Sequence, residues 1–206
     1  IRDPDPDTLC QKIANAKCDH LLKRYENDDV VLITCDQIVV CDGEIREKPT
    51  SPDEARRFLK SYQNGSEAVC VNGLVVHVAA TGKRITVVDK SSVSFRPFPD
   101  SSIEALISSG AAFETAGAFT IDHPALAKYV RTVKGSVDSI EGLPCSKLSA
   151  MLAEATGDSS KFSAAPFGRI THVLFDMDGL LLDTESLYTQ VQQKLLDPYG
   201  LEFTWD

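Results

Sequence analysis

The sequence predicts an α/β protein in which a mixed, twisted sheet is flanked by helices. The apolar, β-branched run at residues 30–34 has the composition of a strand that is buried on both faces. Asp42-Gly43 is a strong signal for a tight hairpin. Segments with apolar residues at helical spacing precede and follow this region. Together these patterns favour strands that alternate with helices around one core.

Composition and charge narrow the class of protein. Of the 206 residues, 43% are hydrophobic and 25% are charged, which is usual for a soluble globular protein. The net charge of −9 argues against binding to nucleic acid or to anionic membranes, because both require a basic surface. No apolar run approaches the roughly 20 residues that span a membrane. We therefore expect a cytoplasmic protein without nucleic-acid or membrane partners.

The six cysteines are scattered and contain no CxxC pair, and most lie in apolar contexts. Such cysteines usually behave as small hydrophobic residues. We expect reduced thiols, as in the cytosol. A disulfide framework is the alternative.

The first elements surround the hairpin. Residues 7–25 predict a helix with Asp7 as its N-cap, because apolar residues recur there near helical spacing. Residues 30–34 then predict a buried strand that ends at Asp36. The chain continues as the two arms of a hairpin through residues 37–46.

The next elements have clear boundary signals. The motif SPDE at residues 51–54 is a capping box with proline at the first helical position. Residues 67–80 and 83–95 show the polar and apolar alternation of two long strands. Asp100 can cap a short helix that stops at Gly110.

The C-terminal part of the pattern predicts a domain boundary. Residues 128–133 predict a further strand, and a last helix follows it. Residues 157–167 are rich in Ser, Ala and Gly and lack periodicity, as in a linker. We therefore expect a domain over residues 1–156 and a separate segment over residues 168–206.

Asp36 and Lys48 are candidates for chemistry. A carboxylate at the end of a buried strand is costly unless it has partners or a function, and the hairpin returns Lys48 towards it. An acid beside a base suits a metal-bound phosphate and its attacking water. The alternative is that Asp36 caps a turn and Lys48 is a solvated surface charge.

Several stretches carry a family resemblance. The run CDQIVVCDGEIREKP at residues 35–49 resembles the Maf family of nucleoside triphosphate pyrophosphatases. Similar stretches are ANAKCDH around Lys17, ETAGAFTIDHP at residues 114–124 and GSVDSIEGLPCSKL at residues 135–148. The resemblance covers roughly residues 7–155. It implies a fold like that of Maf and inosine triphosphatase proteins, often dimeric, and hydrolysis of a nucleoside triphosphate to the monophosphate and pyrophosphate.

The resemblance also implies roles for individual residues. Asp36 would be the general base or the carboxylate that binds a divalent cation, Mg²⁺ or Mn²⁺. Lys17 and Lys48 would neutralise phosphate charge. The family's SxSxRR loop and its following acidic motif do not occur in this sequence, which lacks an initiator Met, so we expect the chain to begin inside a longer protein. A catalytically inactive nucleotide-binding or scaffold module is therefore the second hypothesis.

Gln37 and Asp122 resemble the subgroup of the family that prefers 7-methyl-GTP. The carboxylate of Asp122 only accepts hydrogen bonds, so it suits the N1–H and N2–H edge of a guanine, above all one made cationic by methylation at N7. The neighbouring Ala116-Gly117-Ala118 lacks bulk, so its backbone can approach a ligand closely. The alternative is that Asp122 only begins a turn.

A second motif follows the predicted linker. Residues 170–175 predict a strand, and the sequence DMDGLLLDTES after it resembles motif I of haloacid-dehalogenase-like phosphatases, DxDGxLxD. The resemblance implies that Asp176 is a nucleophile and that Asp178 is an acid and base beside magnesium. One strand and one helix cannot close a core, so we expect a partial βα unit. A phosphatase based on Asp176 is the third and weakest hypothesis.

Overall fold

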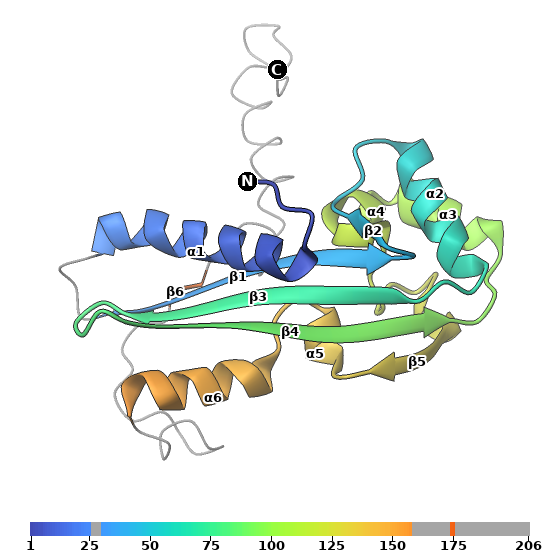
Figure 1. Cartoon of the computed structure of the whole chain (residues 1–206). Coiled ribbons are helices and arrows are strands. Elements are labelled where there is room, and N and C mark those ends of the chain that lie inside the picture. The colour runs from blue at the N-terminus through green and yellow to red at the C-terminus, as the bar shows by residue number, and fades with distance from the viewer. Residues whose placement is uncertain (26–29, 158–173, 176–206) are drawn as a thin grey trace, which may run out of the picture. The chain divides into compact units, whose positions relative to one another are not determined.

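The computed structural model describes residues 1–25, 30–157 and 174–175 (Figure 1). The chain divides into two units, residues 1–175 and 176–206. The first unit contains a sheet with the strand order β2-β1-β3-β4-β5, in which neighbouring strands are antiparallel. The strands are β1 (Val31–Cys41), β2 (Glu44–Arg46), β3 (Ala68–Val78), β4 (Lys83–Phe95) and β5 (Val130–Lys134). A short strand, β6 (Leu174–Phe175), pairs with β1 in parallel.

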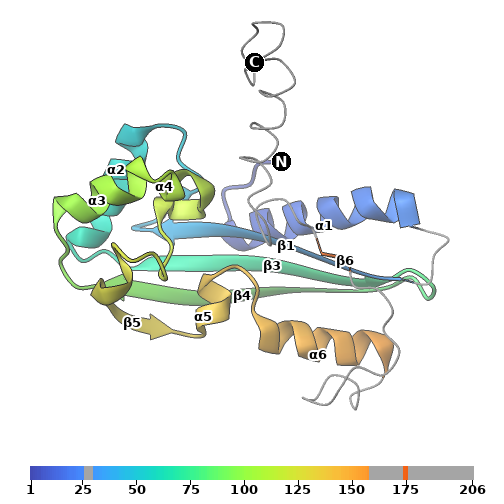
Figure 2. The same ribbon diagram turned by 180° about the vertical axis from the view of Figure 1, so that it is seen from behind.

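Helices cover both faces of this sheet. The α-helices are α1 (Pro6–Tyr25), α2 (Pro52–Gln63), α3 (Asp100–Ser108), α4 (Ala111–Glu114), α5 (Val137–Ile140) and α6 (Cys145–Thr156), and the 3₁₀ helices are η1 (Ala116–Ala118) and η2 (Ala127–Tyr129). α1 lies on one face of the sheet, α5 and α6 lie on the other, and α2, α3 and α4 gather near one end (Figures 1 and 2). The predicted mixed α/β fold is confirmed.

The core has an aliphatic part and an aromatic part. Beneath α1, Leu9 and Cys10 pack against Ile38 and Val71 of the sheet. At the end covered by α2 and α3, the aromatic rings meet edge to face. The Phe95 ring centroid lies 5.6 Å from that of Phe119, and the Tyr62 and Phe119 centroids are 5.3 Å apart. This aromatic cluster fixes α2 and η1 on the sheet.

Gly73 lets α1 pack closely on β3. A Cβ atom at Gly73 would lie 2.5 Å from the carbonyl oxygen of Cys10. We expect Gly73→Ala to push α1 away from the sheet and to lower the free energy of unfolding by about 1–3 kcal/mol, the usual effect of overpacking a core. Urea unfolding followed by circular dichroism measures this loss. An unchanged midpoint would mean that α1 can shift without cost.

Most predicted elements are present, with three local corrections. β1 is one continuous strand, so Asp36 lies within it, opposite Gly73, and not at a strand end. Asp5, and not Asp7, caps α1, since the Thr8 amide donates to Asp5 Oδ2 over 2.9 Å. The Asp100 carboxylate accepts hydrogen bonds from Lys60 and Gln63 instead of capping α3.

The predicted capping box before α2 is confirmed in part. The Glu54 amide donates to Ser51 Oγ over 3.2 Å, as expected. The Glu54 carboxylate accepts from the amide of Thr50 instead of completing the box with Ser51.

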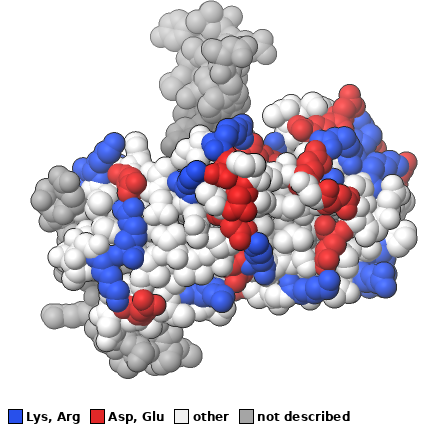
Figure 3. Space-filling view, viewed as in Figure 1, with Lys and Arg blue, Asp and Glu red and all other residues white. Residues whose placement is uncertain are grey.

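The cysteines and the surface agree with a reduced, polar protein. All six cysteines have free thiols, and five of them are buried. Burial, helped by the nearby Asp36 carboxylate, raises the pKa of Cys10 and of Cys35 to about 12, so both thiols stay protonated at neutral pH. Acidic and basic side chains are interspersed over the face in Figure 3. Among the helices that the structure describes, none is long and apolar enough to cross a membrane.

Some predictions fall outside the described residues. These are the linker beyond Gly157 and the phosphatase-like pair Asp176 and Asp178. Of the predicted strand at residues 170–175, the structure describes Leu174 and Phe175, which pair with Leu32 and Ile33 of β1 and belong to the first unit.

Candidate active site

Asp36 and Lys17 form an ion pair on the α1 face of the sheet. Lys17 Nζ lies 3.4 Å from Asp36 Oδ1 and donates a hydrogen bond to the carbonyl oxygen of Cys35 over 3.2 Å. The side chain of Asp36 is 18% exposed and that of Lys17 is 34% exposed, so the pair is accessible to a ligand. The structure thus joins two residues that are 19 positions apart in the sequence.

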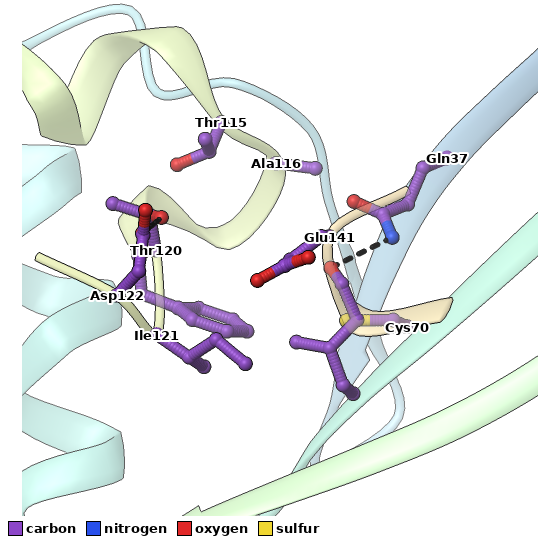
Figure 4. Close-up of a pocket in the computed structure, with 10 residues that line it drawn as sticks. Gln37, Cys70, Thr115, Ala116, Thr120, Ile121, Asp122 and Glu141 are labelled. Atoms are coloured by element: carbon purple, nitrogen blue, oxygen red, sulfur yellow. Dashed lines mark hydrogen bonds between the residues drawn. The ribbon is translucent and has the colours of Figure 1, made fainter. Parts of the chain in front are cut away.

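Gln37 points to the opposite face, because successive side chains of a strand alternate. Its amide nitrogen donates to Asn72 Oδ1 and to the Ser139 carbonyl oxygen, each over 3.0 Å, and to the Ile140 carbonyl oxygen over 3.1 Å. With its nitrogen held by α5 and β3, the side-chain oxygen of Gln37 turns towards Ala116 (Figure 4). Gln37 therefore presents a hydrogen-bond acceptor.

A buried polar network holds this amide in place. Asn72 is fully buried, and its Nδ2 donates to the carbonyl oxygen of Ser139 over 2.9 Å and to Ser139 Oγ over 3.1 Å. The Ser139 hydroxyl in turn donates to Asp89 Oδ2 over 2.6 Å. Because buried polar groups are costly to leave unpaired, the network favours one orientation of Gln37.

Gln37 lines a cavity of about 270 Å³ on this face. Its walls come from the η1 segment with the loop after it and from the end of α5, and Cys70 of β3 forms part of its floor (Figure 4). Asp122 and Glu141 contribute carboxylates, and Asp122 accepts a hydrogen bond from the Thr120 hydroxyl. No lysine or arginine is among the described residues that line this cavity. The cavity is therefore rich in acceptors and negative charge.

Gly117 has a role that differs from the expected close approach to a ligand. Its φ angle is +73°, and a Cβ atom there would lie 2.8 Å from the Tyr62 hydroxyl and 3.0 Å from Val39 Cβ. Its amide donates to the Glu47 carbonyl oxygen, and its carbonyl oxygen accepts from the Tyr62 hydroxyl, both over 3.1 Å. The glycine is thus required by packing against protein, while Ala116 lines the cavity.

Lys48 lies in a different pocket from Gln37 and Asp122. The pairing of Arg46 with Val39 directs the chain after β2 back along β1 towards Asp36. Lys48 then lines a pocket of about 350 Å³ that also includes Leu9 of α1. Because Leu9 packs on the α1 face, this second pocket borders the face that carries Asp36.

The edge of β1 connects the two faces. Along the edge away from β3, β2 pairs with residues 39–41 and β6 pairs with residues 32–33. Asp36 and Gln37 lie between these two pairings, with their side chains on opposite faces of the sheet.

The donor set for a metal ion is small. The described residues contain no group of three or more His, Cys, Asp or Glu side chains that could hold a metal. Asp36, the predicted metal ligand, would supply one carboxylate. That number suits a Mg²⁺ ion whose other ligands are substrate phosphates and water, and it does not suit a cation held by protein alone.

The sequence pointed to Asp36, Gln37 and Asp122 but not to Glu141, which lines the cavity, or to Asn72, which holds Gln37. Glu141 lies within the stretch GSVDSIEGLP, where no residue was expected to contact a ligand. The charge directly before Gly142 was the available signal. Asn72 gave no signal, because a polar residue in an alternating strand usually faces solvent.

Comparisons with known proteins identify the family of this chain. The chain is 37% identical over 150 residues to the 7-methyl-GTP pyrophosphatase of Dictyostelium discoideum, covering 70% of this chain and 75% of that relative. It is 28% identical over 169 residues to the dTTP/UTP pyrophosphatase of Salinibacter ruber, covering 79% and 82%. It is 32% identical over 142 residues to the dTTP/UTP pyrophosphatase of Halalkalibacterium halodurans, covering 68% and 71%. Residues 1–155 match the family described as Maf-like protein, and the chain therefore belongs to the Maf-like family.

Proposed function

We propose that this protein hydrolyses a nucleoside triphosphate to the monophosphate and pyrophosphate, and that 7-methyl-GTP or a similar modified nucleotide is the preferred substrate. One observation carries the proposal. At consecutive positions of β1, Asp36 with its lysine lies on one face, and Gln37 with an acceptor-rich cavity lies on the other. The first side suits phosphates, and the second suits a base that donates hydrogen bonds.

The charge distribution orients the substrate. A triphosphate is repelled by the carboxylates of Asp122 and Glu141, and it is attracted by Lys17 on the opposite face. Lys48 adds a second cation, in a pocket that also contains the carboxylates of Asp3, Glu44, Glu47 and Glu54. We therefore place the base in the cavity and the phosphates across the edge of β1, towards α1. The relatives support the same reaction, because all three that were compared above are named as pyrophosphatases of nucleoside triphosphates.

In the proposed reaction, Asp36 accepts a proton from water while the water oxygen attacks the α-phosphorus. The bond between that phosphorus and the bridging oxygen breaks, and pyrophosphate leaves with the bond electrons. Lys17 Nζ, 3.4 Å from Asp36, stabilises negative charge on the phosphate oxygens. Lys48 neutralises the leaving phosphates.

A divalent cation, Mg²⁺ or Mn²⁺, is part of the proposal. Asp36 is the carboxylate that would bind it together with the substrate phosphates. When bound, such a cation neutralises phosphate charge and polarises the phosphoryl group. A cytoplasmic location and a homodimer remain predictions from the sequence and the family resemblance.

The substrate preference is tested by measuring kcat/KM of the full-length protein for 7-methyl-GTP, dTTP, UTP and CTP. We expect the largest value for 7-methyl-GTP, because its base edge carries two donors that match an acceptor-rich cavity. Preference for dTTP or UTP would contradict the assignment of the base while keeping the reaction. Release of inorganic phosphate without pyrophosphate would contradict the reaction itself.

A nucleotide-binding module without activity is the second candidate. The pairing of Lys17 with Asp36 favours it, since an ion pair can bind phosphate without chemistry. Isothermal titration calorimetry with 7-methyl-GTP separates the candidates: this module would bind the nucleotide while releasing no pyrophosphate over hours.

A further inference from the structure

Glu141 has a fixed backbone at the edge of the cavity. It follows the last residue of α5, and its amide donates to the Val137 carbonyl oxygen over 2.9 Å. The neighbouring residues are anchored to the sheet, since Gln37 donates to the Ile140 carbonyl oxygen and Cys35 Sγ donates to that of Gly142 over 3.1 Å. The position of Glu141 is therefore set by β1.

The carboxylate of Glu141 differs from those of its acidic neighbours. Asp138 accepts hydrogen bonds from the amides of Ser139 and Cys145, and Asp122 accepts one from Thr120. Within the described part of the chain, no donor or cation contacts the carboxylate of Glu141, which extends into the cavity from the wall that faces Asp122 (Figure 4). An acidic group in this setting can bind a ligand without first losing a hydrogen bond to the protein.

The three acceptors of the cavity cannot all read the same feature of a base. Guanine and 7-methylguanine carry the same N1–H and N2–H donors, so acceptors facing that edge distinguish them only by the strength of these hydrogen bonds. The two bases differ in the methyl group and in the positive charge of the five-membered ring. A carboxylate on the wall opposite the edge-reading group is placed to detect the charge.

We propose that Glu141 is a specificity-determining residue that recognises the positive charge of a 7-methylated guanine ring, whereas Asp122 on the facing wall contacts the donor edge of the base. This inference rests on the proposed function, and it adds a discrimination between 7-methyl-GTP and GTP. The carboxylate of Glu141 is exposed, so its attraction to the ring is partly screened by water.

The test is the ratio of kcat/KM for 7-methyl-GTP to that for GTP. In Glu141→Gln the ratio is expected to fall about three- to fivefold, the range for exposed charge pairs. Only kcat/KM for 7-methyl-GTP is expected to fall, because the ring of GTP carries no positive charge that Glu141 could attract. Glu154→Gln is the matched control, since it removes the same charge from an exposed site on α6 and leaves the cavity unchanged.

Other outcomes overturn the inference. Equal losses for both nucleotides would mean that Glu141 only shapes the cavity wall, and an unchanged ratio would mean that it does not contact the base. High salt should lower the ratio of the unaltered protein and leave that of Glu141→Gln nearly constant.

Failure of the proposed function gives a different result. If the unaltered protein hydrolyses neither nucleotide, the reaction is wrong, but calorimetry with 7-methyl-GMP and GMP still decides the inference. Preferential binding of 7-methyl-GMP that weakens in Glu141→Gln would support charge recognition without catalysis. Equal affinities for the two monophosphates would overturn it.

Discussion

Asp36→Asn is expected to lower kcat for nucleoside triphosphate hydrolysis by roughly 10²–10⁴-fold, the usual contribution of a general base. Asparagine has nearly the shape of aspartate but cannot take a proton from water. Because Asp36 is partly exposed within a strand that β3 pairs along most of its length, the fold should survive the exchange. Steady-state kinetics with release of pyrophosphate as the readout measures the loss.

The matched control for this variant is Asp19→Asn. Asp19 also lies in an ion pair, with Arg84 Nη1 2.7 Å from its Oδ1, but it lines neither of the pockets described above. The Asp19→Asn variant should leave kcat unchanged. If the Asp36→Asn variant is folded by circular dichroism and keeps the full kcat, Asp36 has no part in the proton transfer.

Asp122→Asn is expected to lower kcat/KM for 7-methyl-GTP by about tenfold to a hundredfold and to affect UTP much less. Charge-assisted hydrogen bonds contribute about 1.5–3 kcal/mol. The amide that replaces one carboxylate oxygen would also bring a donor against the donors of the base. The Thr120 hydroxyl, which donates to Asp122, keeps the side chain oriented for this contact.

Asp53→Asn serves as the control, since the Asp53 side chain is 95% exposed on α2. The comparison of nucleotides is the decisive part of the experiment. Equal losses for 7-methyl-GTP and UTP would show that Asp122 supports the loop and does not read the base, which is the turn interpretation of this residue.

The sequence predicted the hairpin and the long strands, because these depend on local patterns. It was wrong about Asp36 as a strand end, since a polar residue in an apolar run resembles a boundary. The structure shows how the strand tolerates it: Gly73 opposite brings α1 close, and α1 supplies Lys17. This compensation involves residues that are distant in the sequence, so local patterns could not show it.

The contacts around Gln37 could not be predicted from local patterns either, because they also join residues that are distant in the sequence. Its partners Ser139 and Ile140 are about a hundred positions away, and their backbone oxygens carry no residue-specific signal. The resemblance identified Gln37 as a candidate but could not show which amide atom faces the ligand. The orientation follows only from the buried network with Asn72.

The placement of Asp36 and Gln37 on one strand limits how this enzyme family can evolve. An insertion or deletion of a single residue before them would exchange their faces, so the amide of Gln37 would lie on the α1 face and the carboxylate of Asp36 on the face of the cavity. Substitutions on the far wall of the cavity leave the two faces of the strand unchanged. New substrate preferences should therefore arise through point mutations, while the length of the segment from β1 to the hairpin stays constant among active relatives.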